Sequence, residues 1–545
     1  MSTSYRRAAR EQLPHETTVT IPDLPPELVL LLCTFLPDDD LYRIAFACKR
    51  LHHLALPVYL GRYGCDDEFI FDSLLSPDVM QALRSALYTP RLKRLVYTCR
   101  VGKGHQQGED LRELLEMVEI EDFRLQPGAA SVNQKGRAED QLRQEPDEPE
   151  EEGMTTEAAK QWIGVLDGLI AKARCRCLTA EMDSNQRSVE SIEEGIVREY
   201  YRPHNIVRNT IARWFTPRTR HLEEFRVHST SLFHTGLLQW TLGTLRAPSL
   251  TSVSFSQLHH FAPETWAILL PCITIPNLQH LSINLCAIAT TDLYAFLARH
   301  PAITELNFGR NLLPPDMKAT MPSTLLPTLD TLSGPPDYIV ALLSTRPFGT
   351  ITTVRVVYRA KRASQFTLDA VNHDLAPVCL RLKSVPSVAL AVSFEAGDVD
   401  WVLGARAPDA NQNGLSSAQG SSSSSTMQHS VSFVASCVTK VEFEANVYVL
   451  PLSIVFSLPK WLGGFARIKV FMLRTLASGA RRGVSGDFAE QRKIMNIDTA
   501  PWQVDQFTAA FLQAVVKHCP GLRRVEVDGK EVEVPGPRAD IVRLR

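Results

Sequence analysis

Few side-chain groupings in this sequence could support catalysis or hold a metal ion. Gly102-Lys-Gly104-His-Gln-Gln-Gly108 is glycine-rich, but it lacks the Gly-Lys-Ser/Thr ending of a phosphate-binding loop, so we interpret it as a turn. Cys175-x-Cys177 has no second pair at zinc spacing, and we interpret His259-His260 as a solvated loop pair. Neither Gly-x-Ser-x-Gly nor His-Glu-x-x-His occurs. We therefore expect a chain that is not an enzyme and has no metal or cofactor.

The most informative run of residues lies near the start of the chain, where prolines divide a leucine-rich stretch. Pro25 and Pro26 lack N–H donors, so they fit just before and within the first turn of a helix. The apolar run continues to Leu36, and Pro37 then stops it. The positions of these prolines predict a first short helix that ends near Leu36.

Two more helices are expected directly after it. The carboxylates of Asp38 to Asp40 can cap a helix that we expect to begin near Leu41. A module of about forty residues buries too little surface to fold robustly alone, so it should depend on a partner or on the neighbouring domain. The second helix is expected to expose Leu41, Ile44 and Ala45, and the third carries Leu51, Leu54 and Ala55.

This segment closely resembles the F-box, whose pattern is Leu-Pro-x-Glu, an apolar helix, Leu-Pro-x-x-Asp-Leu and a Cys-Lys-Arg run. Ala47 stands where the family usually has Val, and Leu51 where Trp is common, although both remain apolar. The matching residues are Leu24, Pro25, Glu27, Leu28, Leu32, Leu36, Pro37, Asp40, Leu41, Cys48, Lys49 and Arg50.

The resemblance implies that the module binds a Skp-type adaptor of a cullin-RING ubiquitin ligase. Leu41 and Leu51 would be shared between the module's own core and the adaptor-binding surface. The alternative is that these leucines only fill a helical cap over the open end of a repeat array. The implied adaptor-binding residues are Leu24, Pro25, Glu27, Leu28, Leu32, Leu36, Leu41, Cys48 and Leu51.

A second pattern, apolar-x-x-apolar-x-apolar, recurs along the rest of the chain. Four consecutive full copies begin at residues 222, 250, 278 and 303 and a shortened one, Leu329-x-x-Leu332, at 329, so their starts are 28, 28, 25 and 26 residues apart. The last two apolar positions share a parity, as a strand with one buried face requires. Less regular copies begin at residues 92, 351, 438, 468 and 522. We expect a repetitive array, the alternative being parallel strands of a non-repetitive α/β domain.

Helical patterns precede several of these strands and predict a second layer. In segment 292–301, Leu293, Phe296 and Leu297 follow helical spacing and a proline ends the run. Segments 77–87, 337–343 and 505–518 have the same character.

The residue after the strand adds a resemblance to the leucine-rich repeat, which has a strand plus a helix in roughly 20 to 29 residues. Cys286 and Asn311 each lie three residues past the last strand position, and Asn446 is a third example. In leucine-rich repeats that residue turns inward and satisfies backbone groups. The expected fold is α/β: a three-helix F-box, then an irregular leucine-rich-repeat solenoid of parallel strands and helices.

Two stretches are too polar to bury a core: Gln126 to Gly153, which contains an acidic run, and Ala407 to Gln428, which contains a serine run. Between the first of these and the regular repeats, Trp162 to Phe215 has a helical pattern and is expected to be an insertion after the first strand. The expected organisation is a disordered terminus (1–20), the F-box (21–62), the start of the array (63–125), a disordered acidic linker (126–156), a helical insertion (157–216), leucine-rich repeats (217–406), a Ser-rich disordered loop (407–430) and C-terminal leucine-rich repeats (431–545).

Composition argues against several other classes of partner. The 58 basic and 60 acidic residues give a formal charge of −2, so no net field recruits nucleic acid or an anionic membrane. The 11 cysteines show no regular pairing, which favours reduced intracellular thiols. The longest apolar runs are shorter than the ~20 residues that cross a bilayer, and residues 1–13 lack the apolar stretch of a secretory signal. We expect a cytoplasmic or nuclear protein.

These observations lead to one favoured function and two alternatives. The favoured one is a substrate-recognition subunit of a Skp-cullin-F-box-type ubiquitin ligase, which holds the adaptor through the helical module and an unknown target protein through the repeat surface. The first alternative is a leucine-rich-repeat scaffold without ligase association. A hydrolase built on an α/β sheet is the third hypothesis.

Overall fold

The chain forms two units, residues 1–183 with 217–222, and residues 184–216 with 223–545. The computed structural model describes residues 24–63, 69–71, 77–87, 91–99, 104–127, 156–171, 174–181, 221–233, 235–309, 313–316, 325–345, 348–360, 368–396, 436–446, 452–475, 511–515, 517–527 and 530–533.

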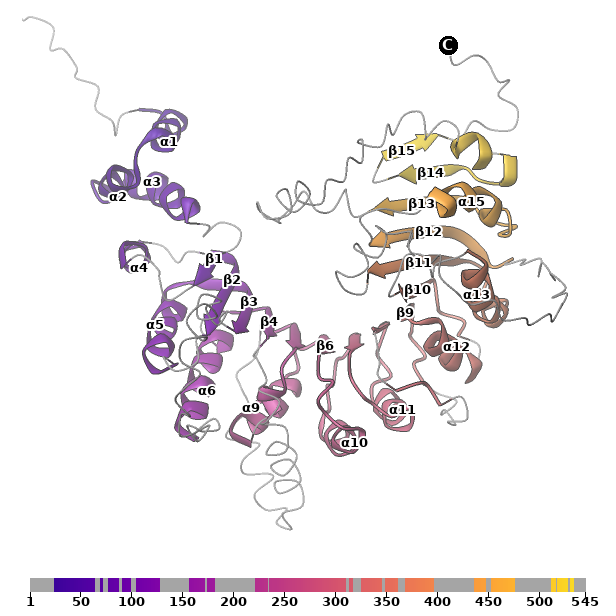
Figure 1. Cartoon of the computed structure of the whole chain (residues 1–545). Helices are drawn as coiled ribbons and strands as arrows, with labels where there is room; N and C mark the ends of the chain where they lie inside the picture. Colours follow the sequence, from indigo (N-terminus) through magenta and orange to yellow (C-terminus); the bar gives the residue numbers. More distant parts are fainter. Residues whose placement is uncertain are drawn as a thin grey trace, which may run out of the picture. The chain divides into compact units, whose positions relative to one another are not determined.

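The first unit begins with three helices and continues with alternating strands and helices (Figure 1). Each neighbouring pair from β1 to β4 is parallel, so every strand must be followed by a crossover. The elements are α1 (Pro26–Phe35), α2 (Asp38–Ala45), α3 (Lys49–Arg62), β1 (Phe69–Phe71), α4 (Pro77–Arg84), β2 (Arg91–Cys99), α5 (Gly104–Met117), β3 (Glu119–Pro127), α6 (Thr156–Ala171) and β4 (Cys177–Ala180).

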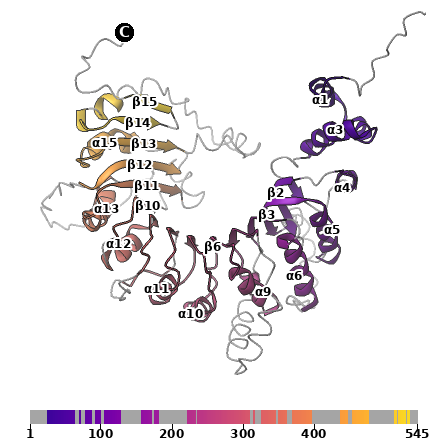
Figure 2. The same ribbon diagram turned by 180° about the vertical axis from the view of Figure 1, so that it is seen from behind.

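The second unit continues the alternation of strand and helix, with its helices along one side of the strands in both views (Figures 1 and 2). Its strands pair in chain order and in parallel up to β14, and β15 closes the series as an antiparallel hairpin. The elements are β5 (Glu224–Val227), η4 (Thr230–Phe233), α9 (Thr235–Leu245), β6 (Ser252–Ser256), α10 (Pro263–Cys272), β7 (His280–Asn284), α11 (Thr290–Ala298), β8 (Glu305–Phe308), β9 (Thr331–Gly334), α12 (Pro336–Thr345), β10 (Thr353–Ala360), α13 (Leu368–Leu382), β11 (Val388–Ala396), β12 (Val438–Asn446), α15 (Leu452–Leu462), β13 (Val470–Thr475), β14 (Arg524–Val527) and β15 (Lys530–Glu533).

The core of the second unit consists of apolar side chains that stack from strand to strand. Val253, Leu281 and Leu306 occupy matched positions on β6, β7 and β8, and all three are buried. The next apolar row packs on the helices, as where the Phe255 ring meets the edge of Trp266 at a centroid distance of 5.8 Å. Because strand side chains alternate between faces, the residues between these rows point away from the helices.

Backbone hydrogen bonds between successive repeats fix where each strand begins. The N–H of Gln279 donates to the carbonyl of Thr251 at 2.8 Å, and Thr304 donates in the same way to Gln279 at 2.8 Å. Asp330 and Thr352 continue the series with N···O distances of 2.8 and 2.9 Å. This repeated bond keeps the strands in register, so that each side-chain row runs straight across the sheet.

The α/β class, the parallel strands and the repetition of strand and helix are confirmed. Each apolar triplet in the sequence contains a strand, and the helices predicted at 77–87, 292–301 and 337–343 are α4, α11 and α12. Of the helix predicted at 505–518, residues 511–515 and 517–518 are described as helical. The two-layer solenoid follows from the spacing of these patterns.

Three sequence-based interpretations are wrong in detail. The helical insertion at 157–216 instead contains an ordinary repeat, because α6 is followed by β4, which pairs in parallel with β3. The glycine-rich run expected to be a turn contributes the first residues of α5 from Gly104. The first polar stretch begins inside β3, which extends to Pro127. Most of the two stretches expected to be disordered, and residues 1–20, lie outside the described residues.

The residue expected to turn inward after the strand does so at Cys286. Its side chain is buried, and its sulfur lies 3.6 Å from the carbonyl oxygen of Phe255 and 3.4 Å from that of Asn284. Asn446, by contrast, is the last residue of β12 rather than a residue beyond it, and Asn311 lies outside the described residues.

Among the helices that the structure describes, none combines the length and the apolar character needed to span a membrane.

Candidate functional site

Helix α1 is apolar on nearly all sides but buries only one narrow face. Val29 and Cys33, four residues apart, point inward and are each 1% exposed, and α1 packs on α3. A surface helix normally presents polar residues opposite its buried face. In α1 the opposite face is also apolar, which leaves leucine side chains in contact with solvent.

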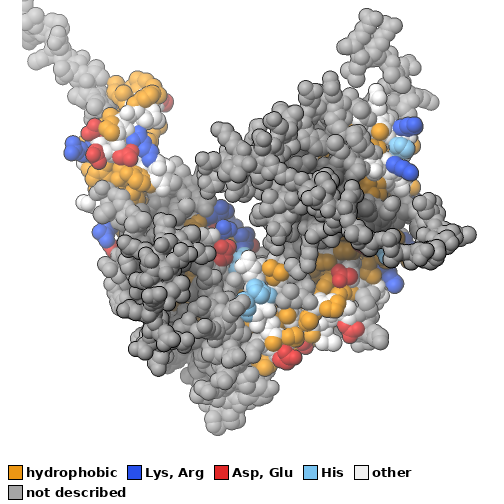
Figure 3. Space-filling view, in the orientation of Figure 1, with side chains coloured by type: hydrophobic (Ala, Val, Ile, Leu, Met, Phe, Trp, Pro, Cys, Tyr) orange, Lys and Arg blue, Asp and Glu red, His pale blue; other side chains and the backbone are white. Residues whose placement is uncertain are grey.

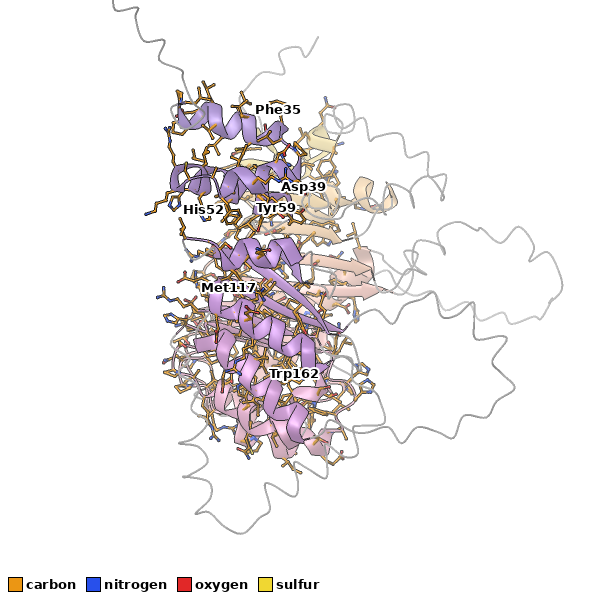
Figure 4. All side chains as sticks on the ribbon, turned by 90° about the vertical axis from the view of Figure 1, so that its left-hand side faces the viewer. Phe35, Asp39, His52, Tyr59, Met117 and Trp162 are labelled. Atoms are coloured by element: carbon orange, nitrogen blue, oxygen red, sulfur yellow. The ribbon has the colours of Figure 1, made fainter. Side chains whose placement is uncertain are left out.

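These solvent-facing residues form a continuous line that we call the α1 stripe: Leu28, Leu31, Leu32 and Phe35. Their spacing of i, i+3, i+4 and i+7 places them on one side of the helix. They are 47%, 54%, 47% and 79% exposed, respectively. Figure 3 shows hydrophobic side chains gathered over α1, and Figure 4 shows Phe35 and His52 on opposite sides of the three-helix module. A contiguous apolar patch of this kind marks an interaction site, whereas single exposed leucines are common.

The last turn of α1 is held by one arginine from α3. Arg62 donates from Nη2 to the carbonyl oxygens of Cys33 and Thr34, at 2.9 and 3.0 Å, and from Nη1 to the Asp38 carboxylate at 2.6 Å. The carbonyls at the end of a helix have no partner within the helix, so a cationic donor there stabilises them. Arg62 thereby connects α1, the start of α2 and the end of α3.

Two further side chains of α3 hold the other helix ends. Arg50 donates to the carbonyl of Leu24 at 2.6 Å, just before α1 begins. His52 is buried, and its Nδ1 lies 2.9 Å from the carbonyl oxygen of Ala45, the last residue of α2. Its Nε2 accepts the N–H of Leu87 at 3.1 Å. These polar contacts fix the helix ends in a module that has a small core.

The second helix differs from its prediction. It begins at Asp38 rather than near Leu41, and no aspartate side chain makes a capping hydrogen bond. The aspartates instead occupy its first turn, where their charge favours the helix dipole. Leu41 and Ala45, expected to be exposed, are 0% exposed because this face packs on α3.

Neither protein-family models nor curated protein sequences give a match to this chain. The functional assignment therefore depends on the geometry of the module.

The residues predicted to bind an adaptor fall into two groups. Leu41 and Leu51 are buried and belong to the module's own core, and their expected share in an adaptor contact stays a prediction. The remaining seven are available: Pro25, Glu27, Leu28 and Leu32 are exposed, and Leu24, Leu36 and Cys48 are partly exposed.

Sequence reasoning missed the two most exposed members of the stripe, Leu31 and Phe35. Their signal was present, because they lie three and seven residues after Leu28, the spacing of one helix face. The role of Arg62 had no comparable signal, since its three acceptors are more than 20 residues away in the sequence.

The groupings considered for catalysis give no metal site in the part of the chain that the structure describes. Cys175 is buried, and burial raises the pKa of its thiol well above the ordinary value. The rings of His259 and His260 lie 3.9 Å apart between centroids. Partial burial, and then the neighbouring His259, lower the pKa of His260. A raised thiol pKa disfavours the reactive thiolate.

Proposed function

We propose that this chain is a substrate-recognition subunit of a Skp-cullin-F-box-type ubiquitin ligase. The observation that carries the proposal is the α1 stripe, which leaves four large apolar side chains exposed on a helix within an F-box-like sequence. Anchors at i, i+3, i+4 and i+7 are typical of a helix that lies in the hydrophobic groove of a partner. The Skp-type adaptor is that partner, and the cullin-RING ligase associates through it.

The exposure of the stripe weighs against the alternative role of a cap on the repeat array. A cap should enclose its apolar side chains against the chain's own residues, yet Phe35 is 79% exposed. The three polar side chains of α3 stabilise the module without using the stripe. The stripe is therefore available to a second protein.

The repeat array supplies the other half of the proposed function. Its strands present a broad face opposite the helices, which suits recognition of a target protein. No catalysis by this chain is needed, because holding the target near a charged conjugating enzyme raises the effective concentration of its lysines. We expect the protein in the cytoplasm or nucleus, where such ligases act.

Substitutions in the stripe test the proposal. Leu32→Ala and Phe35→Ala remove exposed side chains, so each should leave the module folded. Buried aromatic and leucine anchors of an interface cost about 2 kcal/mol each when truncated, so the double variant should weaken adaptor binding by at least a hundredfold. The measurement is the dissociation constant for a purified Skp-type adaptor, followed by co-purification of the cullin.

Leu380→Ala is the matched control, because Leu380 is 61% exposed on α13, outside the module. It should leave adaptor binding unchanged. Equal adaptor affinity of the wild type and the double variant would overturn the proposal. A wild-type chain that binds no adaptor at all would favour the repeat scaffold without a ligase.

A further inference from the structure

The sheet face of the second unit has a hollow of about 340 Å³ across β5, β6, β7 and β8, which we call the β5–β8 pocket. Strand register arranges its lining in two rows. One row comprises Glu224, Ser252, His280 and Glu305, and the other Arg226, Ser254, Ser282 and Asn307.

The pocket is hollow because its central positions have short side chains. Ser252, Ser254 and Ser282 occupy positions where a repeat can also hold a long residue, as Arg226 and Glu305 do at the sides. The volume lies near the lower end of the range for small-ligand sites, which is roughly 300 to 1,000 Å³. It suits a side chain with its adjoining backbone better than a large cofactor.

The hydrogen-bonding groups of the serines and the asparagine that line the pocket are unused among the described residues. Within the described parts of the chain, the side chains of Ser252, Ser254, Ser282 and Asn307 make no hydrogen bond. Ser333, the neighbour of Asn307 on β9, makes none there either, although it is only 7% exposed. Hydroxyl and amide groups both donate and accept, so together they match the alternating N–H and C=O groups of a polypeptide.

The charges around the pocket select among polypeptides. Arg226 is the only arginine or lysine of the lining, and its Nε already pairs with Glu224 at 2.7 Å. Glu305 faces His280 at 3.1 Å. The two glutamates of the lining against its one arginine give a formal charge of −1, counting His280 as uncharged.

A phosphorylated or acidic ligand would be repelled by these carboxylates, and only one guanidinium would be present to bind it. The lining has no aromatic ring besides His280, so the stacking platforms that hold bases are also missing from these residues. A negative cleft favours and attracts a cationic ligand.

Resting on the proposed function, we propose that the β5–β8 pocket binds an extended segment of the target protein that carries a lysine or arginine side chain. The basic group lies between Glu224 and Glu305, and the segment's backbone hydrogen-bonds to the serine and asparagine row. The hydrogen bonds to this row and the ionic contacts with the two glutamates of the other row select the segment, and no covalent step is involved.

Fluorescein-labelled peptide pools with random flanks and one fixed central residue test this with the full chain, measured with and without the adaptor. The central residue is arginine, lysine, glutamate, phosphoserine or norleucine, and binding is followed by fluorescence anisotropy. The arginine and lysine pools should bind, and binding should weaken as salt rises, because exposed charge pairs are screened.

Two kinds of variant separate charge from shape. Glu224→Gln with Glu305→Gln keeps the size of both side chains and should weaken arginine-pool binding at least tenfold. Ser282→Leu fills the hollow and should abolish it. Glu264→Gln, an exposed glutamate in the helix layer on α10, is the matched control and should change nothing.

Tighter binding of the phosphoserine, glutamate or norleucine pool would overturn the inference. So would the absence of arginine- and lysine-pool binding, or an affinity that is the same in the paired glutamine variant. Adaptor binding is measured on the same samples. If the adaptor binds and the basic pools do not, the inference alone fails. If the chain binds the basic peptide pools but does not bind the adaptor, the ligase proposal fails and the inference about the pocket remains supported.

Discussion

The three-helix module and the repeat array place apolar and polar side chains in opposite ways. In the module, the exposed line on α1 is apolar, while Arg50, His52 and Arg62 hold the helix ends together through polar contacts. In the second unit, leucine, valine and phenylalanine rows are buried and the exposed strand face is polar. The second unit therefore buries its apolar side chains within itself, whereas α1 leaves a line of them exposed.

The difference also separates two kinds of recognition. Apolar anchors in a groove give stable association, because burial of apolar area is favourable and non-directional. Unused hydroxyls, amides and carboxylates give selectivity instead, because a ligand that leaves them unpaired pays for their desolvation. The proposed adaptor contact at α1 would thus be the lasting one, and the proposed target contact at β5–β8 the selective and reversible one.

The largest expected effect comes from making the same leucine-to-alanine substitution in each of the two regions. Leu281→Ala removes a 1% exposed side chain between Val253 and Leu306, which should cost about 2–5 kcal/mol. Leu32→Ala removes an exposed one and should cost no more than about 0.5 kcal/mol. Amide hydrogen exchange of β6 to β8 measures the loss locally, since repeat arrays need not unfold as one unit.

Adaptor binding should show the reverse order for the same two variants. Leu32→Ala should weaken it, and Leu281→Ala should leave it unchanged as long as the module remains folded. If Leu32→Ala destabilised its own unit as strongly as Leu281→Ala destabilises the array, the stripe would be part of a core and the contrast would disappear.

A smaller effect is expected from the polar contacts of the module. Arg62→Met removes the donors to Cys33, Thr34 and Asp38, and should destabilise the module by about 1–2 kcal/mol, because hydrogen bonds from charged groups contribute more than neutral ones. Protease cleavage within the module, at a concentration that leaves the wild type intact, measures this opening.

Arg43→Met is the matched control, since Arg43 is 80% exposed and its ion pair with Asp40 has a 3.9 Å separation. Such pairs contribute little. Arg62→Lys should recover only part of the stability, because an ammonium group cannot reproduce the planar fork of a guanidinium. Equal protease resistance of the Arg62→Met and Arg43→Met variants would show that the small apolar core suffices.

Much of this contrast was predictable from the spacing of apolar residues and the positions of prolines. Prolines at 25, 26 and 37 placed α1 within one residue of its ends, because a missing N–H and a fixed φ act locally. The apolar triplets located strands for the same reason, since each triplet alternates between buried and exposed positions. Local rules therefore identified the elements, whereas Leu28 and Leu32 were named through the resemblance to the F-box.

Features that depend on distant residues were not predictable. The Val388–Ala396 strand is an exception, because Val385-Pro-Ser-Val388-Ala-Leu390 has the spacing of the other repeats and this copy was overlooked. Burial of Leu41 depends on α3 packing over it, and the β5–β8 pocket depends on register between four strands. Gly334 is a further case, because a Cβ there would lie 2.8 Å from the Cβ of Phe308 on the neighbouring strand.

Each region has a buried histidine whose two ring nitrogens both make hydrogen bonds to backbone groups. The two histidines give the most detailed comparison between the regions. His52 does so in the module, as described above. In the array, Nδ1 of His300 lies 2.8 Å from the carbonyl oxygen of Phe296, and Nε2 accepts the N–H of Ile275 at 3.1 Å. Because Nε2 accepts, the His300 ring is neutral in the folded state, and protonation would break that bond.

Burial lowers the folded-state pKa of His300 below its ordinary value of about 6.5. The hydrogen bond to the Phe296 carbonyl opposes this shift, and the charge on Arg299 adds to it. The unfolded chain therefore binds the proton more tightly, so stability is complete above about pH 6.5 and is lost as pH falls toward the folded-state pKa. Thermal unfolding at pH 7.5 and pH 5.5 should show a larger decrease for wild type than for His300→Gln, whose amide does not titrate. Parallel pH profiles for the two proteins would mean that the array tolerates a charged ring at this position, which would contradict the prediction.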